Sequence, residues 1–186
     1  IIKNEIGIDD IQVVLTQWQS LIPGLQAKRY DFIIAGMYIT PERCKQALFT
    51  NPFRCSTDSF AFRLNSNSKA KSYADLAKDT SLKLGVVAGS TQSAYAVQNG
   101  VKEGRLQFYS EPLDGLGALK TGRIDVWLGP SDGIAAIFAL PAFDEAGLKT
   151  VSFVPEVGGK PRLGCGGFVF RKEDADVRDI FNRYID

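Results

Sequence analysis

The chain has 186 residues, of which 45% are hydrophobic, and its formal net charge is +1. This length allows one domain or two small lobes with a buried core. The interspersed charges give no indication of a nucleic-acid partner or an acidic tail. No apolar run reaches the roughly 18 residues of a membrane span, and the first residues, Ile1 to Glu5, lack the layout of a signal peptide.

Short apolar strands alternate with helical stretches along the chain, a pattern typical of α/β architecture with largely parallel sheets. The predicted strands cover 12–15, 32–35, 60–63, 83–87, 106–109, 126–128 and 167–170. The predicted helices cover about 19–28, 41–47, 72–78, 91–99, 113–121, 131–139 and 173–183. The polar stretch 65–69 indicates an exposed loop after a crossing strand. We therefore expect lobe 1 to contain 1–63 and 164–186, lobe 2 to contain 64–163, and two hinge crossings to connect them.

The segment most informative about function is 36–43, with the sequence GMYITPER. It follows the apolar run 32–35 and enters a helix through a Thr-Pro-Glu start, which places Arg43 in the first helical turn. A guanidinium can bind a small carboxylate with two parallel hydrogen bonds, and a nearby helix N-terminus adds N–H groups and positive dipole. The alternative interpretation of Arg43 is a solvated helix residue.

The same segment resembles the type II solute-binding proteins of polar amino-acid and compatible-solute ABC transporters, in which a T-P-E-R signature carries the carboxylate-binding arginine. The resemblance continues at 18–26, 28–31, 49–53, 71–77, 84–92, 122–125 and 167–172. The ectoine- and hydroxyectoine-binding group is the most similar, since it also shows Pro-Glu-Arg-Cys and a second cysteine eleven residues on. The resemblance implies a two-lobed type II periplasmic binding protein fold, with a mostly parallel sheet flanked by helices in each lobe. It also implies a periplasmic or other extracytoplasmic location.

Members of this family begin with a strand that carries a ligand-contacting loop, followed by a first helix. This chain starts inside the segment similar to that helix, at 1–7, and its end at 184–186 looks short of a last helix. The resemblance therefore implies that the N-terminal strand of lobe 1 is missing from this sequence, together with half of an aromatic cage.

In amino-acid-binding members, the ligand's ammonium is held by a Ser or Thr five residues before the arginine and by an Asp in lobe 2. The matching positions here are Tyr38 and Pro130, so both polar partners are replaced. Aromatic faces can hold a delocalised or alkylated cation, and Trp18 would supply a second face. Asp132 is a candidate substitute partner for an ammonium. Core packing is the alternative role for Trp18 and Tyr38.

Four further residues are candidate ligand contacts. Ser90 and Thr91 follow the strand 83–87 at a predicted helix start, where hydroxyls and amides suit a carboxylate; a plain N-cap is the alternative, and the two roles are compatible. Gly36 is expected to expose its carbonyl to a ligand donor, or else to serve close packing. Thr40 is either a helix cap or a ligand contact.

The cysteines are Cys44, Cys55 and Cys165. The family resemblance, more than the spacing, implies a disulfide between Cys44 and Cys55, with two packed free thiols as the alternative. Cys165 is expected to be a small buried residue in a glycine-rich crossing.

The sequence contains little that indicates an enzyme. The pentapeptide 129–133 fits a nucleophile-elbow pattern, but the chain has no histidine to act as the base. Without histidine the chain also lacks a common zinc ligand, and the sequence shows no phosphate-binding loop with lysine. Cyclohexadienyl dehydratase-like enzymes share the implied fold, so the fold alone does not exclude catalysis. We expect a protein that is not an enzyme and has no cofactor and no metal.

These observations together predict a monomeric extracytoplasmic solute-binding protein that delivers a small zwitterion to the membrane permease of an ABC importer. Ectoine or hydroxyectoine is the favoured ligand, with Arg43 and Thr91 holding its carboxylate from opposite lobes and Trp18 and Tyr38 boxing its cationic ring. The alternatives are a polar amino-acid or opine binding protein, and the sensor domain of a receptor with the same fold.

Overall fold

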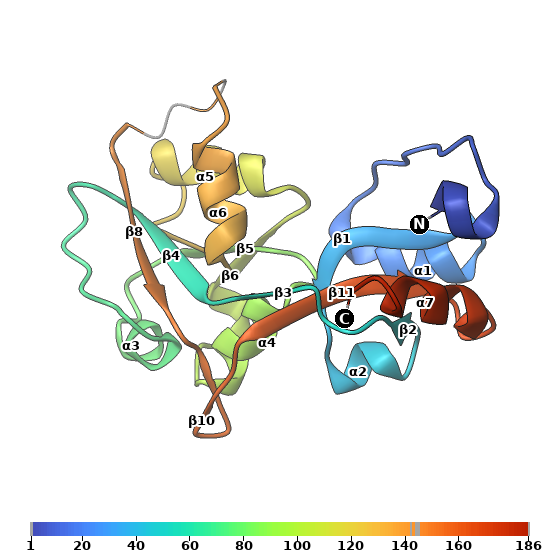
Figure 1. Ribbon diagram of the computed structural model, residues 1–186. Coiled ribbons are helices and arrows are strands. Elements are labelled where there is room, and N and C mark those ends of the chain that lie inside the picture. The colour runs from blue at the N-terminus through green and yellow to red at the C-terminus, as the bar shows by residue number, and fades with distance from the viewer. Residues whose placement is uncertain (1, 142, 144–145, 186) are drawn as a thin grey trace. The chain divides into compact units, whose positions relative to one another are not determined.

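A computed structural model describes residues 2–141, 143 and 146–185. The chain forms two compact units, drawn in Figure 1. Unit 1 consists of Ile1–Cys55 and Cys165–Asp186, and unit 2 of Ser56–Gly164, so the backbone passes between the units twice. The sequence pattern predicts that the first part of lobe 1 ends at residue 63. The structural boundary follows Cys55, because strand β4 (Asp58–Arg63) belongs to the sheet of unit 2.

Unit 1 is built from short elements around a small sheet. In chain order they are η1 (Ile2–Ile6), η2 (Trp18–Ser20), α1 (Leu21–Gln26), β1 (Phe32–Tyr38), α2 (Pro41–Cys44), β2 (Leu48–Phe49), β3 (Arg54–Ser56), β11 (Gly164–Phe170) and α7 (Ala175–Asn182). Strand β11 lies between β1 and β2, runs antiparallel to both, and also pairs with β3. The prediction of a mostly parallel sheet is wrong for this part of the chain, because β11 is the returning segment and not the next strand of a β-α-β series.

Apolar side chains from the helix and the strands of unit 1 form its core. Ile22 and Leu25 of α1 pack with Ile33 and Met37 of β1 and with Val169 of β11. The Trp18 ring is partly buried against this cluster. The strand β1 and the segment that follows it are therefore fixed by packing, and this segment carries the candidate residues 36–43.

Unit 2 contains one mixed sheet with helices on both faces. In chain order its elements are β4 (Asp58–Arg63), α3 (Tyr73–Lys78), β5 (Leu84–Val87), α4 (Thr91–Gln98), η3 (Glu103–Arg105), β6 (Leu106–Tyr109), α5 (Pro112–Lys120), β7 (Val126–Pro130), α6 (Ser131–Phe138), β8 (Leu148–Phe153), β9 (Glu156–Val157) and β10 (Lys160–Pro161). The strand order is β6-β5-β7-β4-β8. Strand β5 is parallel to β6 and β7, whereas β4 is antiparallel to β7 and β8, so the predicted parallel sheet is only half present.

Alternation along β4 separates the two faces of this sheet. Phe60 and Phe62 point into a cluster with residues of α3 and α4, while Ala61 points into a second cluster with Trp127 and residues of α5 and α6. Successive strand residues face opposite sides, so each face receives its own pair of helices. This layering places the ends of β5 and β7, and the helices that follow them, at one edge of the sheet.

The predicted elements agree with the structure for the helices and for most strands. Each predicted helix is confirmed, with ends that differ by at most three residues. The predicted strand 12–15 is wrong: this segment has no strand, and its residues Val13 and Leu15 are 70% and 92% exposed. Strand β8 was not predicted. It lies at the edge of the sheet, and its polar residues Lys149, Thr150 and Ser152 interrupt the apolar run that marks a buried strand.

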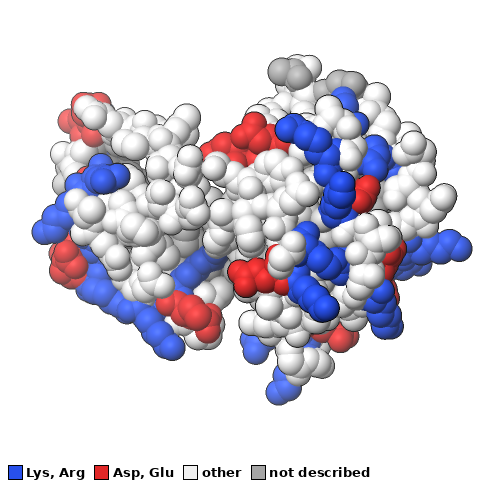
Figure 2. Space-filling view, turned by 180° about the vertical axis from the view of Figure 1, so that it is seen from behind, with Lys and Arg blue, Asp and Glu red and all other residues white. Residues whose placement is uncertain are grey.

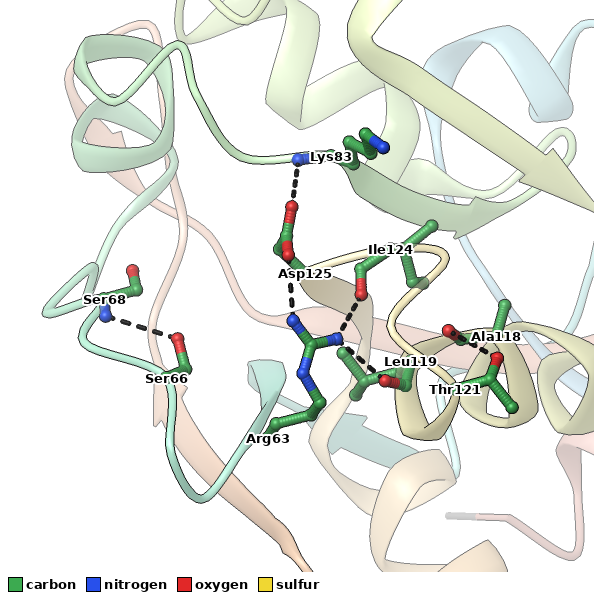
Figure 3. A network of polar contacts seen from close by, with 9 residues as sticks. All are labelled: Arg63, Ser66, Ser68, Lys83, Ala118, Leu119, Thr121, Ile124 and Asp125. Atoms are coloured by element: carbon green, nitrogen blue, oxygen red, sulfur yellow. Dashed lines mark hydrogen bonds and ion pairs between the residues drawn. The ribbon is translucent and has the colours of Figure 1, made fainter.

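Arg63 ties the end of β4 to the turn between α5 and β7 (Figure 3). One of its guanidinium nitrogens, Nη1, donates to the carbonyls of Leu119, at 2.9 Å, and Ile124, at 2.6 Å. Its Nη2 lies 2.9 Å from Oδ1 of Asp125, whose Oδ2 accepts from the Lys83 N–H at 2.9 Å. The segment 122–125, one of those that carry the family resemblance, therefore connects β4, β5 and β7 through these contacts.

A disulfide joins Cys55 of β3 to Cys165 of β11. The predicted Cys44–Cys55 bond is therefore wrong. Cys165 was expected to be a small buried residue, but it forms the disulfide with Cys55. The reason is tertiary: β3 and β11 pair with each other, whereas Cys44 lies in α2 as a free, partly buried thiol. The bond closes a loop of 110 residues that contains the whole of unit 2.

Charged side chains of both signs are spread over the face seen in Figure 2. This distribution agrees with the formal net charge of +1. None of the helices in the described part of the chain combines the length and apolarity that crossing a bilayer requires.

Candidate functional site

Arg43 is placed by a short helix that begins directly after β1. Thr40 is the N-cap of α2, and its Oγ1 accepts a hydrogen bond of 3.3 Å from the backbone N–H of Arg43. Pro41 occupies the first helical position, where its fixed φ suits a helix start. The sequence Thr-Pro-Glu-Arg therefore forms the helix start that was predicted, and Thr40 acts as the cap.

The guanidinium of Arg43 is held on two sides. Its Nη1 donates to the backbone carbonyl of Tyr38 at 2.9 Å. Its central carbon lies 5.7 Å from the centroid of the Trp18 ring, within the range of a cation–π contact. Arg43 is half-buried. A partly desolvated, oriented guanidinium is well suited to a carboxylate, because its planar fork matches the two oxygens.

The structure brings Trp18, Tyr38, Thr40 and Arg43 together in unit 1. Tyr38 is 6% exposed, and Trp18 is partly buried. The Trp18 ring faces the protein's own cation, and the Tyr38 backbone holds that cation through its carbonyl. Both aromatic residues thus have a supporting role for Arg43, whereas the predicted box around a ligand cation stays a prediction.

Gly36 lies in β1 with a φ of +62°, at an irregularity in the pairing with β11. A Cβ atom on Gly166 would lie 2.3 Å from the Gly36 carbonyl oxygen, so the two backbones are in close contact. This geometry supports the close-packing interpretation of Gly36, and a contact between its carbonyl and a ligand stays a prediction.

In unit 2, Ser90 and Thr91 form the start of α4. Ser90 is the N-cap, and its Oγ accepts from the Ser93 N–H at 3.4 Å. Thr91 is buried, and its hydroxyl donates to the side-chain oxygen of Gln92 at 3.4 Å. The first N–H groups of a helix have no acceptor inside the helix. The first turn of α4 therefore presents oriented backbone donors and the positive end of a dipole, which together suit a carboxylate.

Pro130 ends β7 and precedes α6. Since β5 and β7 are parallel neighbours, Pro130 at the end of β7 and Ser90 shortly after the end of β5 lie at the same edge of the sheet. In α/β sheets, ligands bind outside the carboxyl ends of the strands. Asp132, the candidate substitute, lies in the first turn of α6, and its Oδ1 accepts from the Gly133 N–H at 2.8 Å.

Comparison with known proteins identifies the family. Residues 1–186 match the bacterial extracellular solute-binding proteins, family 3. The chain belongs to this family. The probable amino-acid ABC transporter periplasmic-binding protein of Sinorhizobium fredii is 32% identical over 183 residues, which cover 97% of this chain. The chain spans only 60% of the length of that relative.

Solved structures place the family 3 chain in the type II periplasmic binding protein fold, as the sequence predicted. The structure of EhuB in complex with hydroxyectoine matches with a TM-score of 0.83 and 30% identity, and the match covers 99% of this chain and 69% of that one. A mutant of arginine-bound ArgBP from T. maritima matches with a TM-score of 0.82 and 26% identity over 99% of this chain and 79% of that one. The mixed sheets and the two units agree with these matches.

Two buried polar residues of this family 3 protein, Asp58 and Gln92, are not among the predicted site residues. Asp58, the first residue of β4, is only 1% exposed, and it accepts hydrogen bonds from Tyr73 and Gln92. Burial raises the pKa of the Asp58 carboxyl, and these two hydrogen bonds oppose the rise. No sequence signal marks Asp58, because an aspartate that follows a crossing segment is usually exposed. Gln92 was noted only as part of the segment 84–92.

A separate cavity of about 400 Å³ lies in unit 2 between α6 and the strands β4 and β8. Ser59, Ser131, Thr150 and Ser152 are among the residues that line it. The predicted ligand residues are not part of its lining. Among the described residues, no group of three or more His, Cys, Asp or Glu side chains is arranged to hold a metal ion.

Proposed function

We propose that this protein is an extracytoplasmic solute-binding protein that captures a small zwitterion for import by an ABC transporter. Its partners would be the ligand and the membrane permease of the importer. Membership of family 3 supports the general role, and the relative from Sinorhizobium fredii carries the name of a probable amino-acid ABC transporter periplasmic-binding protein.

The observation that carries this proposal is the environment of Arg43. The guanidinium is half-buried, oriented by the Tyr38 carbonyl at 2.9 Å, and stacked near Trp18 at 5.7 Å. Such a group loses part of its hydration before a ligand arrives, so binding a carboxylate costs less desolvation. Ser90 and Thr91 at the start of α4 are the groups of unit 2 that suit a carboxylate in the same way.

Ectoine or hydroxyectoine is the favoured ligand. An α-ammonium that loses water needs polar acceptors, and each unmet charged donor costs about 1–3 kcal/mol or more. Tyr38 and Pro130 provide no side-chain carboxylate or aliphatic hydroxyl at the two positions where one would be needed. A cyclic amidinium or methylated ammonium spreads its charge, and an aromatic face contributes roughly 0.5–2 kcal/mol to holding it. EhuB, which was solved with hydroxyectoine, is among the similar structures.

Calorimetric titration of the protein at its full natural length tests this proposal. The ligands would be ectoine, hydroxyectoine, glycine betaine, arginine, glutamine and octopine. We expect a preference for the compatible solutes of at least about tenfold, or ~1.4 kcal/mol. The double variant Tyr38→Ser/Pro130→Asp restores the usual ammonium partners and should shift the preference toward amino acids. Tyr38→Phe is the matched control and should leave the preference unchanged, because it keeps the ring.

Binding of a polar amino acid or an opine is the second candidate function. The observation in its favour is Asp132, a carboxylate in the first turn of α6, two residues after Pro130. Tighter binding of a free amino acid or octopine than of any compatible solute would establish this second candidate. In that case Asp132→Asn should weaken binding of the amino acid by at least about tenfold, because it removes a charged acceptor.

A further inference from the structure

Asp58 lies where three elements of unit 2 meet. It is the first residue of β4 and is 1% exposed. Its Oδ2 accepts from the hydroxyl of Tyr73, the first residue of α3, at 2.6 Å. Its Oδ1 accepts from Nε2 of Gln92, the second residue of α4, at 2.7 Å. One buried carboxyl group therefore joins the first turns of two helices to the start of a central strand.

The contact with Asp58 fixes the orientation of the Gln92 amide. An ionised carboxylate can only accept hydrogen bonds, so the amide nitrogen must face Asp58 and the amide oxygen must face the other way. That oxygen accepts from the Thr91 hydroxyl at 3.4 Å. Gln92 is itself buried, at 3% exposed. The side chains of the first two residues of α4 are thus set in order by Asp58.

Neither the strand nor the helix needs this carboxylate for its own backbone pairing. Strand β4 is paired on both sides, with Asp58 opposite Pro130 of β7 and Phe153 of β8. The N-cap of α4 is provided separately by Ser90. A buried carboxylate at this point is costly unless its hydrogen bonds are made, so a polar group here calls for a reason beyond local stability.

We propose that Asp58 is a positioning residue for the ligand: through Gln92 it holds the first turn of α4, and with it Ser90 and Thr91, in the geometry that meets a carboxylate. This inference rests on the proposed function for the role of α4. Asp58 itself does not contact the ligand. Tyr73 completes the arrangement by donating to the second carboxylate oxygen, while Gln92 donates to the first.

The first test measures affinity for ectoine in the full-length protein. Asp58→Ala and Gln92→Met should each weaken binding by about tenfold, the effect of losing one buried hydrogen-bond partner. Asp58→Asn should stay within about threefold of the wild type, since its Oδ1 can still accept from Gln92. The double variant Asp58→Ala/Gln92→Met should bind ectoine no more weakly than the weaker-binding single variant, because both changes break the same hydrogen bond between Gln92 and Asp58. Additive losses in the double variant would overturn the proposal.

The matched control is Arg63→Met, at the other end of the same strand. It removes the hydrogen bonds to Leu119, Ile124 and Asp125 and should destabilise unit 2 without reaching α4. We expect ectoine affinity within about twofold of the wild type for Arg63→Met. An affinity loss as large as that of Asp58→Ala would show that general destabilisation explains both results, and the positioning role would be wrong.

The second test needs no ligand. In an α-helix each N–H bonds to the carbonyl four residues earlier, so the amides of Tyr95 and Ala96 report on Thr91 and Gln92. Hydrogen exchange of these two amides should speed up about tenfold in Asp58→Ala and return close to the wild-type rate in Asp58→Asn. Unchanged exchange in Asp58→Ala would refute the proposal. If no ligand in the panel binds the wild type, the proposed function fails, and this exchange measurement still decides the role of Asp58.

Discussion

The two units carry their candidate carboxylate-binding groups on different kinds of structure. In unit 1 the candidate group is a charged side chain, Arg43, held by the Tyr38 carbonyl and the Trp18 ring. In unit 2 it is the start of a helix, which is capped by Ser90 and whose second residue, Gln92, donates to the buried Asp58.

This difference indicates which substitutions should weaken ligand binding most in each unit. The candidate group of unit 1 is one full charge, so we expect its removal to have a large effect on binding. The candidate groups of unit 2 are several backbone N–H groups and a partial dipole charge, so we expect no single side chain there to have an equal effect. Tyr38 and Arg43 of unit 1 are only 5 residues apart in the sequence, whereas Asp58 and Gln92 are 34 residues apart and meet only through the fold.

The largest expected effect is at Arg43. Arg43→Ala should cost about 2–5 kcal/mol of ligand affinity, because it leaves a desolvated carboxylate without its charge partner. Arg43→Lys should recover only part of this loss, since an ammonium cannot form the planar fork. Calorimetry of both variants with ectoine measures the effect. A wild-type affinity in the alanine variant would contradict the hypothesis that the Arg43 charge binds the ligand carboxylate.

The disulfide is expected to have the next largest effect, on stability and not on affinity. Cys55→Ser or Cys165→Ser should lower the free energy of unfolding by about 2–4 kcal/mol, because the bond closes a loop of 110 residues that carries all of unit 2. Urea unfolding measures this loss. Cys44→Ser is the matched control and should change nothing, since Cys44 is the free thiol. Alkylation of Cys55 in natively folded, unreduced protein would contradict the bond.

Trp18 tests how the candidate group of unit 1 works, because its ring faces the Arg43 guanidinium. Trp18→Ala should weaken ectoine binding by about 0.5–2 kcal/mol, the usual contribution of a cation–π contact, and Trp18→Phe should retain most of the affinity. If Trp18 acts by supporting Arg43, the loss should disappear when Trp18→Ala is made in the Arg43→Ala variant. A loss of equal size in both backgrounds would instead show that the ring contacts the ligand cation directly.

The smallest expected effect is the pH dependence due to Asp58. Burial raises the pKa of this carboxyl above its ordinary value of 3.8, so the folded state binds the proton more tightly than the unfolded state. The Asp58 contribution to stability therefore increases as the pH falls through the raised pKa, and it is complete below 3.8. Asp58→Asn removes it. The free energy of unfolding of the wild type minus that of the variant should rise as the pH is lowered, and a flat difference between pH 7 and pH 3 would contradict the shift.

The sequence by itself determined the α/β class, the helices and the capped helix start that carries Arg43. Each of these depends on neighbours in the chain: apolar periodicity forms helices and strands, and Thr40 caps the helix that carries Arg43 only three residues away. Family motifs are also local, so the resemblance could be recognised from short segments such as 36–43 and 84–92.

Only the tertiary structure decided the pairing of Cys55 with Cys165, the antiparallel strands, and the contact of Asp58 with Gln92. Each of these joins segments that lie far apart in the chain, and their choice of partner depends on how the sheets pair. The cysteine closest in the sequence to Cys55 was not its partner, because β3 pairs with β11 and α2 does not. The aspartate carries no local pattern either: its burial results from three elements meeting around it, a property that exists only after the sheet of unit 2 has formed.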